Sequence, residues 1–177
     1  METAGERARL GDGTEVVLRP IRPDDAPKLI DLHSRLSPES VYLRFLGPRP
    51  TLPPEEARRL ATVDYDRTMA IVATQPRGDD EAIVGVARYA AVRPDSNEEA
   101  EAAIVVEDTF QGMGLGTILM RRLIEHARGR GVATMSAEIT AGNERMLRFI
   151  RRSGLPFSQR LEGGSWQIRA DIAYDGP

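Results

Sequence analysis

The sequence predicts an α/β protein of the α+β kind, in which a mixed sheet carries helices on both faces. Three observations lead to this fold class. Short runs rich in Val, Ile and Ala and flanked by turn residues are typical of strands. Longer segments with apolar residues three and four positions apart are typical of amphipathic helices. In the order of these elements, a part dominated by strands is followed by strand, helix, strand, helix and strand, which predicts the mixed sheet.

The composition limits what such a protein can be. The 177 residues fit one domain, and with 41% hydrophobic residues the chain can bury a sizeable core. The absence of cysteine excludes disulfides, thiolate zinc sites and a cysteine nucleophile, and two histidines argue against a histidine-rich metal site. A formal net charge of -3 provides no basic excess for nucleic acid or an anionic membrane. We therefore expect no metal, nucleic-acid or membrane partner.

The sequence also predicts where the protein is found and how it is divided. No apolar run approaches the length of about 20 residues that a membrane-spanning helix needs. Residues 1–9 are polar and lack the apolar core of a signal peptide, so we expect a cytoplasmic protein. Residues 1–14 are expected to form a flexible N-terminal segment, and residues 15–177 a single domain.

The first part of this domain is expected to form one strand and three short helices. Apolar residues alternate over residues 15–22, which predicts the strand. Each helix is expected where a capping residue or a proline precedes apolar residues at helical spacing. These starts are at Asp24 or Asp25, at Ser37-Pro38 and at Pro53-Pro54. His33 lies beside the apolar stripe of the first helix and is interpreted as structural.

The second part is expected to supply most of the sheet. Two strands joined by an exposed turn are followed by a loop and by a central apolar strand, and two helices then alternate with the remaining strands. The expected ranges are strands 68–74 and 82–92, a turn at 75–80, a loop at 93–98, a central strand ending at Val106, a helix from Gly114, a strand at 132–139, a helix opened by Asn143, and strands at 156–160 and 166–172. Four arginines of the last helix, at 145, 148, 151 and 152, are interpreted as a solvated face.

The turn after the central strand carries the strongest chemical signal. Gly112, Gly114 and Gly116 leave backbone amides without side-chain cover, and the first amides of a helix have no partner within it. These donors lie at the positive end of the helix dipole and suit a phosphate or pyrophosphate. A dinucleotide fingerprint would need glycine in place of Thr117, and a phosphate-loop NTPase would need a lysine that the turn lacks. From the glycines alone, a turn that serves only close packing stays equally open.

The residues Gln111-Gly112-Met113-Gly114-Leu115-Gly116 have the form Gln/Arg-x-x-Gly-x-Gly/Ala, which resembles the acyl-CoA-binding motif of the GNAT acyltransferase superfamily. The resemblance implies the GNAT fold, with a mostly antiparallel sheet, and acetyl-CoA as cosubstrate without a metal. It also implies that the central strand binds the pantetheine arm and that the amides of the turn bind the pyrophosphate. The cofactor-binding residues expected on this basis are Ile104, Val105, Val106, Gln111, Gly112, Met113, Gly114, Leu115, Gly116, Thr117 and Asn143.

Five further segments make the resemblance closer. They are residues 18–25, 36–40, 43–45, 63–67 and 85–89, which look like the catalytic domain of bacterial protein lysine acetyltransferases of the Pat type. The similarity runs from about residue 18 to residue 157. It implies an amine acceptor on a protein, for example an acyl-CoA synthetase. Independently of this resemblance, we expect the first three helices to wall the acceptor side.

Acetylation of an amine benefits from a base, since a lysine with a pKa of about 10.4 is unprotonated only about once in 2,500 at pH 7. Glu101 is the candidate, because it begins the central strand and would share a face with Ala103 and Val105. We expect its carboxylate to be partly buried, as suits a general base. In the Pat-like family, the glutamate at the matching place is the catalytic base. The alternative is a solvated acid at a strand end.

Two positions in the last helix bear on the same reaction. Asn143 stands where family members carry an asparagine that contacts the coenzyme, and it would serve equally well as a helix N-cap. Many GNAT enzymes have a tyrosine in this helix as general acid for the leaving thiolate, but Ile150 occupies the matching position. The resemblance therefore supplies no general acid, and water could donate the proton.

Two other functions stay open at this point. A small-molecule amine acetyltransferase would use the same coenzyme site and base, because only the acceptor wall would differ. A non-catalytic acyl-CoA-sensing module is favoured by the missing tyrosine and opposed by Glu101.

Overall fold

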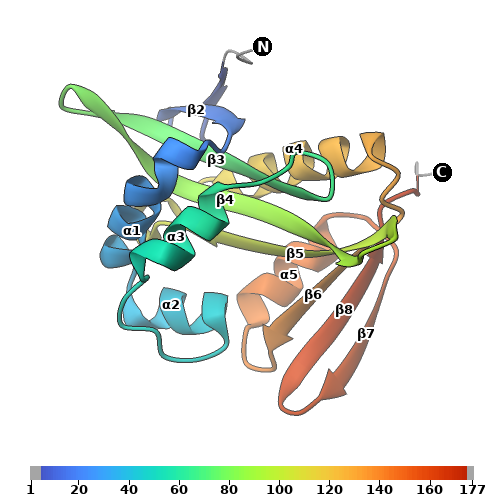
Figure 1. Cartoon of the computed structure of the whole chain (residues 1–177). Coiled ribbons are helices and arrows are strands. Elements are labelled where there is room, and N and C mark those ends of the chain that lie inside the picture. Colours follow the sequence, from blue (N-terminus) through green and yellow to red (C-terminus); the bar gives the residue numbers. More distant parts are fainter. Residues whose placement is uncertain (1–4, 175–177) are drawn as a thin grey trace.

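The computed structural model describes residues 5–174, which form one eight-stranded sheet with helices on both faces (Figure 1). The strand order is β1-β2-β3-β4-β5-β6-β8-β7. Every neighbouring pair in the sheet is antiparallel except β5 and β6, which are parallel. The sheet is therefore mixed and mostly antiparallel, and the predicted fold class is confirmed.

The elements have the following bounds. The strands are β1 (Glu6–Arg9), β2 (Glu15–Pro20), β3 (Thr68–Arg77), β4 (Asp80–Arg93), β5 (Ser96–Val106), β6 (Thr134–Thr140), β7 (Phe157–Glu162) and β8 (Ser165–Asp171). The α-helices are α1 (Ala26–Arg35), α2 (Pro38–Phe45), α3 (Pro54–Ala61), α4 (Leu115–Gly129) and α5 (Glu144–Arg152), and two short 3-10 helices are η1 (Pro23–Asp25) and η2 (Asp108–Phe110).

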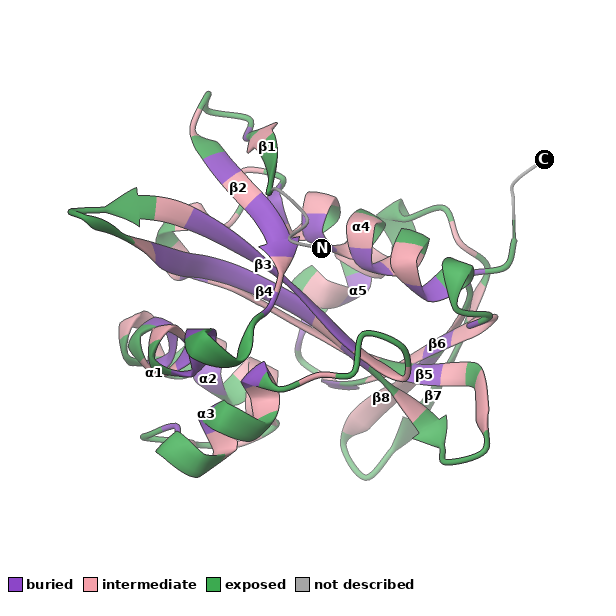
Figure 2. Cartoon of the chain, turned by 45° about the horizontal axis from the view of Figure 1, so that its top comes forward, coloured by how far each residue is buried: buried purple, intermediate pink, exposed green. Residues whose placement is uncertain are grey.

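The helices cover the two faces of the sheet separately, with α1, α2 and α3 on one face and α4 and α5 on the other (Figure 2). On the first face, apolar residues of α1 and α3 such as Leu29 and Ala57 pack against Val72 of β3. On the second face, the predicted stripe of α4 is fully buried, and each leucine buried in this way stabilises the fold by roughly 1.5–3 kcal/mol. The stripe consists of Leu115, Leu119, Leu123 and Ala127.

The flexible N-terminal segment predicted for residues 1–14 is wrong over residues 6–9. These residues form β1, which pairs antiparallel with β2 so that Glu6 lies opposite Leu18. β1 is an edge strand and is mostly exposed, and only Ala8 packs against the core, so the strand has no alternating apolar pattern. Residues 1–4 of the predicted segment lie outside the described residues.

The hairpins on either side of β4 are longer than the sequence predicts. β3 and β4 turn only at Gly78 and Asp79, not over residues 75–80, and residues 93–98 belong mostly to β4 and β5. These strand ends extend beyond the helices that cover the sheet, and most of their side chains are exposed. The polar composition of these residues indicated loops, but backbone hydrogen bonds continue the strands through them.

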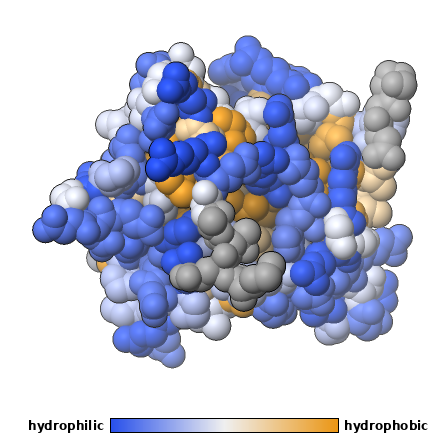
Figure 3. Space-filling model, turned by 90° about the horizontal axis from the view of Figure 1, so that it is seen from above, coloured by the Kyte–Doolittle hydropathy of each residue, from blue (hydrophilic) through white to orange (hydrophobic). Residues whose placement is uncertain are grey.

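Seen from above, the surface is mostly hydrophilic, with apolar side chains near its centre and towards one side (Figure 3). Among residues 5–174, no helix combines the length and the apolar character that crossing a membrane requires.

Candidate active site

The turn between β5 and α4 presents backbone amides to open space. Gly112 and Gly114 have φ angles of 78° and 87°, in the left-handed region that favours glycine. A Cβ atom at either position would meet nothing within 4 Å. The first hydrogen bond of α4 runs from Ile118 N to Gly114 O (3.1 Å), so the amides of residues 115–117 have no intrahelical acceptor.

The amides of the preceding residues complete this set. Those of residues 112–114 donate to no backbone acceptor in the described part of the chain. The amide of Gln111 differs from the prediction, because it donates to Asp108 O (3.2 Å). Consecutive amides from Gly112 to Thr117 can therefore donate to an anion at the positive end of the α4 dipole, which is the arrangement that a pyrophosphate requires.

β5 and β6 are paired over a short distance and then separate. Their parallel ladder joins residues 99–101 to residues 134–136. β5 continues to Val106 and β6 to Thr140, with no further pairing between them among the described residues. Residues 102–106 are paired with β4 on one side only, so their other edge is open to an extended ligand chain.

Glu101 is the last residue of β5 that pairs with β6 before the two strands separate. Val105, at the same parity of the strand, packs towards α1 and α3, whereas Ala102 and Ile104 pack towards α4. Glu101 therefore shares a face with Val105, as predicted, and this is the face that α1, α2 and α3 cover. The expected burial is wrong, because Glu101 is exposed and so is Ala90, its partner on β4. Helices α1, α2 and α3 therefore leave Glu101 and Ala90 uncovered.

Asn143 and Ile150 both serve the packing of α5. Asn143 is buried, and its side-chain oxygen accepts a hydrogen bond from Met146 N (3.0 Å), which caps the helix. A coenzyme contact of Asn143 stays a prediction. Ile150 packs near Leu147 and Ile168 in a small core between α5 and the strands β6 and β8. α5 contains no tyrosine, so this helix offers no phenolic acid to a leaving thiolate.

A hydrogen-bond network that sequence reasoning missed joins the turn to α2 and α5. Gln111 Nε2 donates to Val106 O (2.8 Å) and to Ser40 Oγ (3.2 Å). Both terminal nitrogens of Arg145 donate to Gln111 Oε1, one of them at 2.6 Å. The side chain of the first motif residue thus links α5, the end of β5 and helix α2.

Asp108 anchors the N-terminus of α2 to the same region. Its carboxylate accepts hydrogen bonds from Ser37 Oγ (2.6 Å), Ser37 N (3.0 Å) and Ser40 Oγ (2.8 Å). Burial alone would raise the pKa of Asp108, but these hydrogen bonds outweigh it and lower the pKa. The serines at 37 and 40 belong to a segment that carries the family resemblance, and this was the one signal that could have drawn attention to them.

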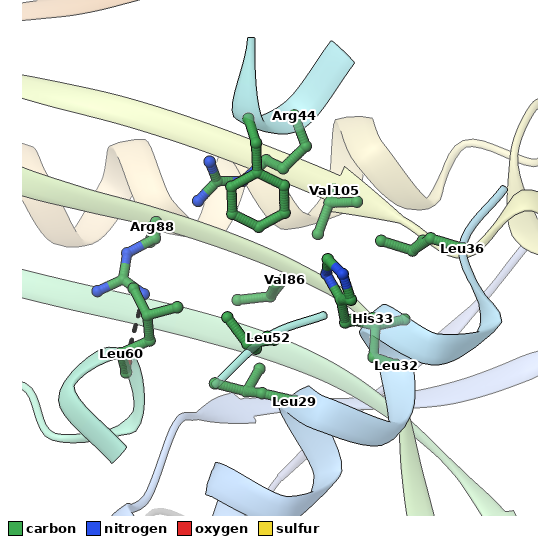
Figure 4. A pocket seen from close by; sticks show the side chains of 11 residues that line it. Leu29, Leu32, His33, Leu36, Arg44, Leu52, Leu60, Val86, Arg88 and Val105 are labelled. Atoms are coloured by element: carbon green, nitrogen blue, oxygen red, sulfur yellow. Dashed lines mark hydrogen bonds between the residues drawn. The ribbon is translucent and has the colours of Figure 1, made fainter. Parts of the chain in front are cut away.

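A small apolar pocket lies on the face of the sheet that α1, α2 and α3 cover, between these helices and the strands β4 and β5 (Figure 4). It encloses about 40 Å³. His33 lines it, and its Nε2 lies 2.8 Å from Arg49 O, which supports a structural role for this histidine. Arg44 of α2 and Arg88 of β4 also line the pocket, and sequence reasoning missed both.

The charges around this pocket act on one another. Burial, together with repulsion from Arg44, lowers the pKa of Arg88 to about 10. Burial also lowers the pKa of Arg44, an effect that the negative charge of Glu101 opposes. Within residues 5–174, no three His, Cys, Asp or Glu side chains gather where they could hold a metal ion.

Comparison with known proteins agrees with this geometry. A family model described as "Acetyltransferase (GNAT) family" matches residues 34–155. Acetyltransferase PA5475 of Pseudomonas aeruginosa is 36% identical over 137 residues, which are 77% of this chain and 73% of that protein. Acetyltransferase Pat of Mycolicibacterium smegmatis is 34% identical over 139 residues, which are 77% of this chain and 40% of that protein. The crystal structure of the GNAT domain of S. lividans PAT is similar with a TM-score of 0.85 at 27% identity, over 94% of this chain and 96% of that one.

The open strand edge and the free amides of the turn form a site that would fit an extended cosubstrate carrying a pyrophosphate. The chain belongs to the GNAT family of acetyltransferases. It is an acyl-CoA-dependent N-acetyltransferase that uses acetyl-CoA, and its resemblance to the catalytic domains of Pat-type enzymes is confirmed. The chain spans 40% of the length of the M. smegmatis Pat protein.

Proposed function

We propose that this enzyme transfers an acetyl group from acetyl-CoA to the side-chain amine of a protein lysine, with Glu101 as the general base. The observation that carries this proposal is the position of Glu101 at the point where β5 and β6 separate. From there an open strand edge leads to the free amides of the turn. One extended cosubstrate could therefore bind at the turn and reach Glu101.

In this proposal acetyl-CoA follows β5. The pyrophosphate would bind the amides of Gly112 to Thr117, and the pantetheine arm would pair with the backbone of Ile104 to Val106. From Val106 to Glu101 an extended strand spans about 17 Å. The thioester at the end of an extended arm would then lie beside Glu101. Asn143 would contact the coenzyme through its side-chain NH₂ group, since its oxygen caps α5.

The chemistry needs little beyond placing the amine and removing its proton, because a thioester is already activated. At pH 7, freeing a lysine amine from its proton costs roughly 4.6 kcal/mol. Glu101 would take that proton, directly or through water, and the amine nitrogen would attack the carbonyl carbon. The C–N bond forms, the tetrahedral intermediate collapses and the C–S bond breaks. The nitrogen loses its second proton to water, and the thiolate of coenzyme A takes a proton from water, so that the products are the amide and neutral coenzyme A.

The protein-lysine acceptor rests on the resemblance to Pat-type catalytic domains, which the similarity to M. smegmatis Pat and to the S. lividans domain supports. An acyl-CoA synthetase is the acceptor that this resemblance suggests, and a cytoplasmic location stays a prediction. A small-molecule amine is the second candidate, because the pocket between α1, α2, α3 and the sheet could receive a small acceptor group. A non-catalytic acyl-CoA-sensing module is the third.

The test measures coenzyme A release from acetyl-CoA with acyl-CoA synthetases and with small amines, for wild type and Glu101→Gln. The matched control is Glu98→Gln, which changes another exposed glutamate of β5. Loss of a general base lowers kcat by about 10²- to 10⁴-fold, and we expect this only for Glu101→Gln. The dissociation constant of acetyl-CoA should change less than about twofold, since Glu101 touches no part of the proposed pyrophosphate site.

Each other outcome has a distinct meaning. Turnover confined to small amines would overturn the protein-lysine acceptor and support a small-molecule acetyltransferase. Tight acetyl-CoA binding without turnover on any amine would support the non-catalytic sensing module. Equal turnover in wild type and Glu101→Gln would overturn the role of Glu101.

A further inference from the structure

Two arginine side chains share the pocket on the face covered by α1, α2 and α3, and neither has a carboxylate partner among residues 5–174. Arg44 comes from α2 and Arg88 from β4, 44 residues further along the chain. Figure 4 shows both guanidinium groups on the side of the pocket away from His33. The rest of the lining is largely apolar, with leucines from α1 and α3 and valines from β4 and β5.

The contacts of these two arginines leave most of their donors unused. Arg88 Nη1 donates to Leu60 O at 3.3 Å, and the guanidinium carbon of Arg44 lies 4.9 Å from the centroid of the Phe45 ring. Neither forms an ion pair within the described residues, although the nearby Arg49 pairs with Glu56. Guanidinium groups placed among apolar side chains normally have an anionic partner, because losing hydration is costly.

The electrostatics lead to the same conclusion. Burial and the like charge of Arg44 lower the pKa of Arg88 to about 10, which means that its environment disfavours the positive charge. A bound anion would relieve the mutual repulsion of both groups. An anion would also be held more strongly here than in open solvent, because the apolar lining lowers the effective dielectric constant.

This pair of arginines lies close to the proposed base. Arg88 is paired with Ala103 of β5. Ala103 and Glu101 lie on the same face of this strand, and two residues of an extended strand span about 7 Å. The negative charge of Glu101 acts on Arg44 and favours its positively charged form, against the effect of burial. An anion between the two guanidinium groups would therefore lie on the same face of the sheet as Glu101 and near it. It would also stand apart from the pyrophosphate site, which lies beyond the other end of β5.

We propose that Arg44 and Arg88 form a subsite for a carboxylate of the acceptor, so that the enzyme selects amines that carry a carboxylate nearby. This inference rests on the proposed function, because it concerns the acceptor of that reaction. A carboxylate fits the planar donor pattern of guanidinium groups, and a cavity of about 40 Å³ has room for one small group. The carboxylate could belong to an acidic residue beside an acceptor lysine or to a free α-amino acid.

The experiment uses acceptors in matched pairs. The peptide pair carries one lysine flanked by either Glu or Gln, and the small-molecule set consists of free α-amino acids and their carboxamides. Coenzyme A release is measured for wild type, Arg44→Gln and Arg88→Gln. Arg58→Gln is the control, since Arg58 is an exposed arginine of α3 that does not line the pocket.

We expect wild type to prefer the carboxylate member of one set by at least about tenfold in kcat/KM, through a lower KM. Whichever set shows the preference identifies the source of the carboxylate. Arg44→Gln and Arg88→Gln should remove the preference between the two members of each pair and leave the acetyl-CoA affinity unchanged. Arg88→Lys keeps the charge without the planar fork and should retain part of the preference.

A binding measurement separates this inference from the proposed reaction. The affinity of the CoA-bound protein for the same acceptor pairs is measured by calorimetry, and folding of each variant is checked by circular dichroism. Carboxylate binding that depends on both arginines, in a protein that acetylates no amine, would support the subsite and overturn the reaction. Turnover with no preference for carboxylates in wild type, or a preference that survives in both glutamine variants, would overturn the subsite.

Discussion

The turn proposed to bind the coenzyme and the wall proposed to bind the acceptor are constructed in different ways. The turn is one continuous segment, residues 111–117, whose proposed ligands are backbone amides fixed by the left-handed φ angles of two glycines. The proposed acceptor wall brings together α1, α2, α3 and two strands, and the groups that it presents are side chains. Changes in the turn should therefore alter coenzyme binding, whereas changes in the wall should alter stability or acceptor choice.

Charged contacts hold the wall against the sheet. At the start of α1, Asp25 accepts hydrogen bonds from both terminal nitrogens of Arg19, each at 2.7 Å, and from Arg22 N at 2.8 Å. Glu81 of β4 binds the same Arg19 from the other side. The side chains of Arg19 and Asp25 are 5% and 4% exposed, so this pair is buried and removal of one member leaves a poorly compensated charge.

The largest effect is expected for Asp25→Ala, which should destabilise the wall and leave the turn intact. Breaking a buried ion pair typically costs 3–5 kcal/mol, and because Glu81 still binds Arg19 we expect about 3 kcal/mol. For a chain of this length that corresponds to a loss of about 6–12 °C in Tm. Urea unfolding measures the change, with Asp24→Ala as control, because Asp24 is an exposed neighbour. At a temperature where Asp25→Ala stays folded, acetyl-CoA affinity should match wild type.

The same substitution has a pH signature. Burial would raise the pKa of Asp25, but the hydrogen bonds from Arg19 and Arg22 outweigh it and lower the pKa. The stabilisation by Asp25 is therefore complete above the unfolded pKa of about 3.9 and is lost as the pH falls through the lower folded value. The stability difference between wild type and Asp25→Ala should shrink below about pH 4. A difference that stays constant to pH 2 would contradict this account.

These two regions also differ in how far the sequence predicts them. The stripe of α4, the glycine turn and the capping role of Asn143 follow from residues within one turn of one another, where local geometry decides. The pairing of β5 with β6 over three residues only, and the meeting of Arg44 with Arg88, depend on segments far apart in the chain. The segments at 43–45 and 85–89 were marked by the family resemblance, but nothing local indicated that they face each other.

The burial of Glu101 shows the same limit. Strand alternation correctly placed Glu101 on the face of Val105, because the period of two is a local property. Its exposure is decided by where the wall of helices ends, which depends on the lengths and angles of α1, α2 and α3. Strand β1 was not predicted for a related reason, since an edge strand that packs only Ala8 against the core needs no apolar alternation.

A smaller effect, confined to coenzyme binding, is expected for Gly114→Val. A β-branched residue at a φ of 87° costs about 1–3 kcal/mol, and the turn should relax to a conformation in which its amides no longer converge. The dissociation constant of acetyl-CoA should rise by about 10- to 100-fold. Gly129→Ala, at the other end of α4 where φ is not positive, is the control and should bind normally. Lower stability with unchanged affinity would mean that the glycines serve only packing.

The smallest effect is expected where the two regions meet, at Arg145. Its guanidinium holds the side chain of Gln111, which in turn contacts Ser40 of α2. Because Arg145 is exposed, Arg145→Ala should weaken acetyl-CoA binding by only about two- to fivefold, and less at high salt. Arg148→Ala changes an exposed arginine of the same helix and should have no effect. If both variants weaken binding equally, the arginine-rich face of α5 attracts the coenzyme phosphates through its overall charge, and the link through Gln111 contributes nothing to binding.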